Sequence, residues 1–212
     1  MQTVKTKYFE YGKIEMDYLK SVDLIMGDAI ERMGKIEREV IPDLFTALVY
    51  AIVGQQISAK AVNTIWNRMQ QSFYEITPRI IASSQVSEIQ QCGMSTRKAS
   101  YIKSAGESVV EGLINLEELK KLSDDEVIKR LSSLKGIGIW TAEMLLLNSM
   151  ERKNIISFGD IAIKRGMMNL YGLTEITKEK FNGYKKIYSP YGSVASIYLW
   201  KLSFANKEEN YA

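Results

Sequence analysis

The strongest constraint on the fold is a short run with two glycines between two helical patterns. The run reads Leu134-Lys135-Gly136-Ile137-Gly138-Ile139-Trp140-Thr141-Ala142. It predicts a tight hairpin between helices, because glycine accepts positive φ and lets another backbone come close. The helix starting near Ile139 would point free N–H groups at the hairpin, and its dipole favours an anion there. We expect a phosphate site formed by Gly136, Ile137, Gly138 and Thr141; the alternative is an ordinary tight turn.

A single acid, Asp160, follows the hairpin at the expected start of another helix. It stands after Gly159 and before the apolar and basic stretch 161–165. A carboxylate at that place can act in catalysis, where the helix dipole favours its ionised form. The alternative is that Asp160 only caps the helix, since Asp is among the preferred N-cap residues. One residue can also do both.

Composition excludes several classes of active site. The 212 residues include no histidine, which rules out Ser-His-Asp and Cys-His catalysis and zinc sites with histidine ligands. The one cysteine, Cys92, cannot form an internal disulfide, hold an iron–sulfur cluster or supply a four-thiolate zinc site. Acid–base chemistry therefore falls to Asp, Glu, Lys or Tyr. The net charge of +3 is compatible with nucleic acid but does not argue for it.

The sequence also indicates where the chain works. No apolar run approaches the roughly 18–20 residues that span a bilayer. Residues 1–13 are charged and lack the apolar segment of a secretory signal. We expect a cytoplasmic protein near the nucleoid in a prokaryote, or a nuclear one in a eukaryote.

Apolar periodicity predicts an all-α protein of about ten helices. The clearest segments are 40–53, 58–72, 95–111 and 193–204, and Ser123 with Glu126 forms a capping-box pattern. Strand is expected only within 1–16 and 155–158. Nothing in the composition marks a long linker.

Four motifs together carry a family resemblance. They are 52–58 (IVGQQIS), 92–98 (CGMSTRK), the hairpin, and 159–165 (GDIAIKR). With these motifs the chain resembles the helix-hairpin-helix DNA glycosylase superfamily and, within it, 3-methyladenine DNA glycosylase II in its compact, yeast-type form. The resemblance implies one helical glycosylase unit over 1–212 with two lobes flanking a DNA-binding cleft. The central lobe would span about 36–150, with the hairpin at 132–146, and the second lobe 1–35 plus 155–212.

The resemblance also implies a reaction. Asp160 would stabilise the positive charge that develops on the sugar and direct the attacking water. An indole, Trp140, stands where bifunctional members have a Schiff-base lysine, so a monofunctional glycosylase is implied. The expected substrates are cationic alkylated purines such as 3-methyladenine and 7-methylguanine in double-stranded DNA, bound by a monomer. The alternatives are a glycosylase for hypoxanthine or an oxidised base, and a non-catalytic DNA-binding protein.

By the same resemblance, Trp140, Tyr191, Met144 and Gln55 would line the base pocket. Trp140 and Tyr191 could instead be packing residues. Gln56 would fill the gap left by a flipped base; the alternative for the glutamine pair is interhelical hydrogen bonding.

The remaining implied contacts involve the DNA backbone. The candidates are Ser58, Thr96, Arg97, Lys98 and Lys164. The basic residues among them could equally be solvated or ion-paired. No cofactor is required, but a monovalent cation (Na⁺ or K⁺) would be held by the backbone carbonyls of Ser132, Leu134 and Ile137.

Overall fold

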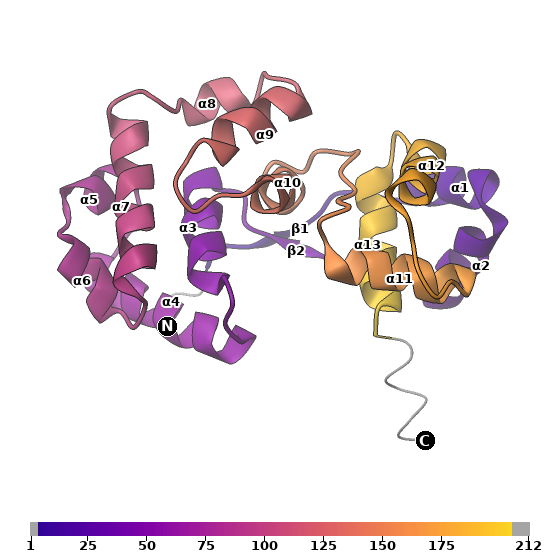
Figure 1. The fold of residues 1–212 in the computed structure, drawn as a ribbon, viewed down its shortest axis with the longest axis horizontal. Helices are drawn as coiled ribbons and strands as arrows, with labels where there is room; N and C mark the ends of the chain where they lie inside the picture. The colour runs from indigo at the N-terminus through magenta and orange to yellow at the C-terminus, as the bar shows by residue number, and fades with distance from the viewer. Residues whose placement is uncertain (1–3, 205–212) are drawn as a thin grey trace. The chain divides into compact units, whose positions relative to one another are not determined.

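Helices form nearly all of the regular structure in the computed structural model, which describes residues 4–204. Within this range there are thirteen α-helices and one two-stranded sheet (Figure 1). The predicted all-α fold class is therefore confirmed. No helix in the described range combines the length and the apolar character that crossing a bilayer requires.

The chain divides into two compact units. Unit 1 contains residues 4–7 and Val40–Met150, and unit 2 contains Tyr8–Glu39 and residues 151–204. The predicted second lobe included the first 35 residues, whereas residues 4–7 belong to unit 1. The chain passes from one unit to the other within each of the paired strands β1 (Lys7–Tyr8) and β2 (Glu39–Val40), and again between Met150 and Glu151.

Unit 1 is built around the long helix α7. Its helices are α3 (Leu44–Gly54), α4 (Ala59–Phe73), α5 (Pro78–Ser83), α6 (Val86–Gln91), α7 (Thr96–Val110), α8 (Leu116–Leu119), α9 (Asp124–Ser132) and α10 (Ile139–Asn148). Helix α7 packs against α3, α5 and α6, while α10 packs against α3 and α9 (Figure 1). Leu48, Ile102 and Leu146 are fully buried between these helices.

Local sequence signals start several of these helices at the expected residue. The Ser58 and Ser95 hydroxyls accept hydrogen bonds from Ala61 N and Lys98 N, each at 3.3 Å. The capping box at Ser123 is present, with Ser123 N donating to Glu126 Oε2 at 3.0 Å. Such bonds satisfy N–H groups that the first helical turn cannot pair internally.

Both stretches expected as strand differ from the prediction. Residues 1–3 of the first stretch lie outside the described residues, and within 4–16 only Lys7–Tyr8 is extended in a sheet. Helix α1 begins at Lys13, where Gly12 N donates to Glu15 Oε2 at 2.9 Å. The segment 155–158 pairs with no strand; Ile155 N donates instead to the Ser193 hydroxyl at 2.9 Å. The predicted helix 40–53 begins at Leu44, since Asp43 caps it by accepting from Thr46 N at 2.7 Å.

Unit 2 combines segments from both ends of the described chain. It holds α1 (Lys13–Val22), α2 (Leu24–Met33), α11 (Ile161–Tyr171), α12 (Lys178–Tyr188) and α13 (Gly192–Leu202). Helix α11 packs against α13 and α2, and α1 packs against α12 and α13. Leu19, Met26, Met167 and Tyr198 are among the buried side chains of this core.

A carboxylate, Asp23, joins the early and late helices of unit 2. Its Oδ1 caps α2 by accepting from Ile25 N and Met26 N at 2.9 and 3.0 Å. Its Oδ2 accepts hydrogen bonds from the hydroxyls of Tyr171 and Tyr188. Burial is the main cause that raises the pKa of both phenols, so they remain protonated donors.

The close approach of α11 to α13 at Gly166 provides a stability test. A Cβ at Gly166 of α11 would overlap the Leu199 carbonyl of α13, whereas one at Gly183 of α12 would meet no atom within 4 Å. We expect Gly166→Ala to destabilise the protein by about 1–3 kcal/mol through overpacking. Gly183→Ala, the matched control, should stabilise it by roughly 0.5–1 kcal/mol. Urea unfolding measures both, and equal effects would contradict this packing argument.

Candidate functional site

The glycine hairpin joins α9 to α10 and is held against α7. Gly136 has φ 85°, and a Cβ there would overlap the ring of Tyr101. Gly138, the N-cap of α10, has φ −86° and no atom within 4 Å of the place where a Cβ would stand. Positive φ and close packing, expected of both glycines, therefore occur only at Gly136. At Gly138 the missing side chain leaves open space beside the helix start.

The start of α10 has the geometry of an anion site. The first N–H groups of an α-helix have no partner inside the helix, and the dipole adds partial positive charge. Ile137 and Thr141 are both buried, at 4% and 6% exposure. Ile137 N donates to Leu134 O at 3.1 Å, whereas Thr141 N lies in the first turn of α10. A phosphate contact from Thr141 would use this N–H, and the contact expected of Ile137 stays a prediction.

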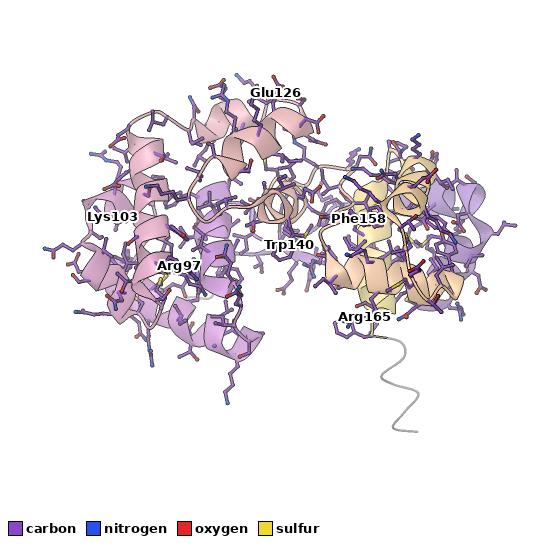
Figure 2. All side chains as sticks on the ribbon, viewed as in Figure 1. Arg97, Lys103, Glu126, Trp140, Phe158 and Arg165 are labelled. Carbon is purple, nitrogen blue, oxygen red and sulfur yellow. The ribbon has the colours of Figure 1, made fainter. Side chains whose placement is uncertain are left out.

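Two predicted pocket residues lie one turn apart on α10. Trp140, near the start of the helix, keeps 46% of its surface exposed (Figure 2). Met144 is half-buried. Residues four apart lie on the same helix face, so the indole and the thioether are neighbours there. The wide exposure of Trp140 argues against a core packing role.

The two glutamines form the turn between α3 and α4. Gln55 Nε2 donates to Gly136 O at 2.8 Å, which ties this turn to the hairpin. Gln56 is exposed and has φ 57°, a conformation that non-glycine residues rarely adopt. Gln55 thus makes the interhelical type of bond, while Gln56 projects from a strained backbone, a feature that often marks functional residues.

The predicted backbone contacts on α4 and α7 occupy different environments. Ser58 is an exposed N-cap, and Thr96 and Arg97 lie exposed in the first turn of α7 (Figure 2). The Lys98 ammonium, in contrast, donates to Val53 O and Gln55 O at 2.8 and 2.6 Å. Burial, and secondly repulsion from Arg97, lowers the pKa of Lys98. This ammonium is therefore engaged inside unit 1.

In unit 2, Asp160 is the N-cap of α11. Its Oδ1 accepts from Ala162 N at 2.8 Å and from Ile163 N at 2.9 Å, and the residue is 5% exposed. The interpretation of Asp160 as the N-cap of α11 is therefore confirmed. Neither capping bond uses Oδ2, so the cap is compatible with a catalytic role for the second oxygen. That role stays a prediction.

Arg38, which sequence reasoning missed, acts electrostatically on Asp160. Burial lowers the pKa of its guanidinium, and attraction to the Asp160 carboxylate opposes part of that shift. The guanidinium carbon lies 4.4 Å from the centre of the Trp200 ring. A cation stacked on an indole is held in place, so Arg38 is a fixed positive charge acting on the acid. No local pattern links residues so distant in the chain.

Tyr191 has an aromatic neighbour that the sequence did not reveal. It lies at the start of α13, and its ring centre is 5.2 Å from that of Tyr18 in an edge-to-face arrangement. The Tyr18 hydroxyl donates to Ser189 O in the preceding turn. Tyr191 is therefore oriented by α1, and its place in a base pocket stays a prediction.

The basic residues after Asp160 also have defined surroundings. The Lys164 ammonium lies 4.8 Å from the centre of the Phe158 ring, a cation–π contact within unit 2. Arg165 is exposed on α11 (Figure 2). A DNA contact from either residue stays a prediction.

The expected cation site consists of backbone carbonyls. Within residues 4–204, no group of three or more acidic or cysteine side chains lies close enough together to hold an ion. The carbonyls proposed for a monovalent cation flank the hairpin, and that of Leu134 accepts from Ile137 N at 3.1 Å. A carbonyl oxygen has two lone pairs, so this bond leaves capacity for a ligand.

Comparison with known proteins places these features in a wider group. The family model described as "HhH-GPD superfamily base excision DNA repair protein" matches residues 49–188, which include the hairpin and Asp160. DNA-3-methyladenine glycosylase 1 of Schizosaccharomyces pombe is 37% identical over 164 residues. That alignment covers 75% of this chain and 72% of the relative.

Solved structures show the same fold. The crystal structure of a DNA-3-methyladenine glycosidase from Bacillus halodurans has a TM-score of 0.85 at 34% identity, covering 96% of this chain and 95% of that one. The Schizosaccharomyces pombe 3-methyladenine DNA glycosylase in complex with abasic DNA has a TM-score of 0.78 at 31% identity. Here the coverage is 89% and 96%.

Proposed function

Because the chain belongs to the HhH-GPD superfamily of base excision DNA repair proteins, we propose that it is a DNA glycosylase that excises alkylated purines from DNA. The names of its relatives support the substrate class, 3-methyladenine in particular. The structural relative in complex with abasic DNA supports DNA as the partner, and we propose that this DNA is double-stranded. We propose that the chain acts as a monomer of the 3-methyladenine DNA glycosylase II type.

The observation that carries the proposal is the buried carboxylate at the start of α11. Two backbone N–H groups hold Asp160 Oδ1, and the Arg38 charge attracts the carboxylate. As the C1′–N bond breaks, its electrons leave with the base and positive charge grows on the sugar. A fixed anion stabilises that charge. Water then adds to C1′, and its proton passes to Asp160 or solvent.

Trp140 supports both the choice of lesion and the choice of mechanism. An indole face attracts a cationic base by about 0.5–2 kcal/mol, so an alkylated purine would be favoured over a neutral one. A cationic base also departs as a neutral molecule, which removes the need for a strong general acid. With no amine at position 140 to attack C1′, we propose hydrolysis without strand cleavage.

The hairpin is proposed to grip the DNA backbone. Open space beside Gly138 and the N–H groups at the start of α10 suit a phosphate, a contact that positions DNA without reading its sequence. We also propose that a monovalent cation binds the carbonyls of Ser132, Leu134 and Ile137. When bound, it would place a positive charge beside that phosphate.

Release of free methylated bases from alkylated duplex DNA tests the function. We expect wild-type protein to release 3-methyladenine and 7-methylguanine, and Asp160→Asn to be slower by about 10²–10³-fold, as when one stabilising group is lost. Asn is as good an N-cap as Asp, so the variant should keep its fold, which unfolding curves would check. Release of hypoxanthine or an oxidised base alone would reassign the lesion, and no release would refute the enzyme.

Borohydride trapping tests the monofunctional mechanism. Incubation with lesion DNA and borohydride should give no covalent protein–DNA adduct, because only an amine attack forms a reducible Schiff base. A bifunctional member of the superfamily serves as positive control. An adduct formed by this protein would contradict the assignment based on Trp140.

The two hairpin glycines separate DNA binding from folding. A Cβ at position 138 would enter open space, so Gly138→Ala should leave stability nearly unchanged yet weaken DNA binding by obstructing the phosphate. Gly136→Ala should instead destabilise the protein by about 1–3 kcal/mol, through the Tyr101 ring and the positive φ. Fluorescence anisotropy and urea unfolding measure the two effects. If Gly138→Ala bound DNA as tightly as wild type, the hairpin would be an ordinary tight turn without a phosphate contact.

A further inference from the structure

Helix α7 extends two lysines to the ends of two neighbouring helices. The Lys98 ammonium donates to Val53 O and Gln55 O at the end of α3. The Lys103 ammonium donates to Ala82 O and Ser84 O at the end of α5, at 2.8 and 3.0 Å (Figure 2). Both cations satisfy carbonyls that the last helical turn leaves unpaired, where the helix dipole also favours positive charge.

The segments that follow the two capped ends differ. After α5 the chain turns into the short helix α6, with Ser84 in an ordinary extended conformation at φ −78°. After α3 it enters the turn with Gln56 at φ 57°. The Gln55 carbonyl that Lys98 binds belongs to the peptide bond joining Gln55 to Gln56. Lys98 therefore holds the peptide plane on one side of the left-handed residue.

A second bond, made by the side chain of the same residue, fixes the turn to the hairpin. The Gln55 side chain donates to Gly136 O, and Gly136 itself lies against the ring of Tyr101. Tyr101 stands three residues after Lys98, on the same stretch of α7. The segment between α3 and α4 and the hairpin are thus both held by residues of one helical turn of α7. Gln56 is the exposed residue that this arrangement presents.

We propose that Lys98 is a positioning residue that holds Gln56 ready to enter the gap left by a flipped base, and that it does not contact DNA phosphate. The inference rests on the proposed function, since only a base-flipping enzyme leaves such a gap in the duplex. Two of the three N–H donors of the Lys98 ammonium are held by carbonyls at 2.8 and 2.6 Å, which fixes the ammonium against the turn. Its effect therefore passes through the backbone of the turn.

The first experiment uses the DNA-free protein and so does not depend on catalysis. Backbone ¹⁵N relaxation should give order parameters near 0.85 for residues 55–58 in wild type, falling below about 0.6 in Lys98→Met. Lys103→Met removes an equivalent cap from the same helix and should leave residues 55–58 rigid. Lys98→Arg, which keeps a charged donor, should restore rigidity. A rigid turn in Lys98→Met would overturn the proposal.

The second experiment measures insertion. A duplex carries a tetrahydrofuran abasic analogue with 2-aminopurine opposite, and the fluorescence change is read at saturating protein, where it reports geometry and not affinity. Lys98→Met should lose at least half of the wild-type amplitude and Lys103→Met none. Gln56→Ala should show the same loss, and adding Lys98→Met to it should change nothing more. Additive losses would mean that Lys98 acts by another route.

The third measurement separates positioning from phosphate contact. The salt dependence of DNA affinity should keep its slope in Lys98→Met, whereas removing one phosphate contact lowers the slope by about 0.9. Arg97→Met, on the exposed neighbouring residue, is the comparison for a true contact. A lowered slope in Lys98→Met would overturn the proposal. Failure of wild type to release methylated bases would refute the proposed function and with it the insertion role of Gln56, whereas the relaxation result separately tests whether Lys98 holds the turn.

Discussion

The packing of Gly136 against the Tyr101 ring is the contact on which the architecture of unit 1 depends. It sets the hairpin at one distance from α7, and it leaves no room for any side chain at that glycine. From this fixed point, Gln55 reaches Gly136 O and Lys98 secures the end of α3. Two segments with proposed DNA roles therefore share one rigid helix, which is the arrangement that precise positioning of a substrate requires.

In unit 2, the proposed catalytic carboxylate of Asp160 is positioned in a different way. Asp160 is at once a proposed catalyst and the cap of α11, so the helix that it starts also orients it. Arg38 and Trp200 form a stacked pair whose charge acts on the same carboxylate. The carboxylate is 5% exposed, and a buried polar group needs such hydrogen-bonding and charged partners to offset its lost hydration. Structural and chemical demands on Asp160 thus coincide.

The sequence predicted what local chemistry determines. The caps at Ser58, Ser95 and Ser123 span three residues each, so a short pattern reveals them. The bond from Gln55 to Gly136 spans 81 residues and that from Lys98 to Val53 spans 45, and no periodicity encodes such pairs.

Because short patterns do not reveal contacts between distant residues, only part of the candidate site could be predicted from the sequence. Asp160, Trp140 and Gln56 could be named from motifs, but Arg38 and Tyr18 could not, because only tertiary packing brings them to Asp160 and Tyr191. The backbone conformation of Gly138 could not be predicted from the sequence either, since glycine identity permits many φ values and selects none.

The division of the chain into two units has a further consequence, for the order of folding during synthesis. All described residues of unit 1 precede residue 151, so unit 1 leaves the ribosome whole before α11–α13 do. Helices α1 and α2 can pack against α11–α13 only after those helices have emerged, so the hydrogen bonds from Tyr171 and Tyr188 to Asp23 form last. Domains generally fold as units as the chain emerges, so the unit carrying the hairpin forms first and the unit carrying the acid closes last.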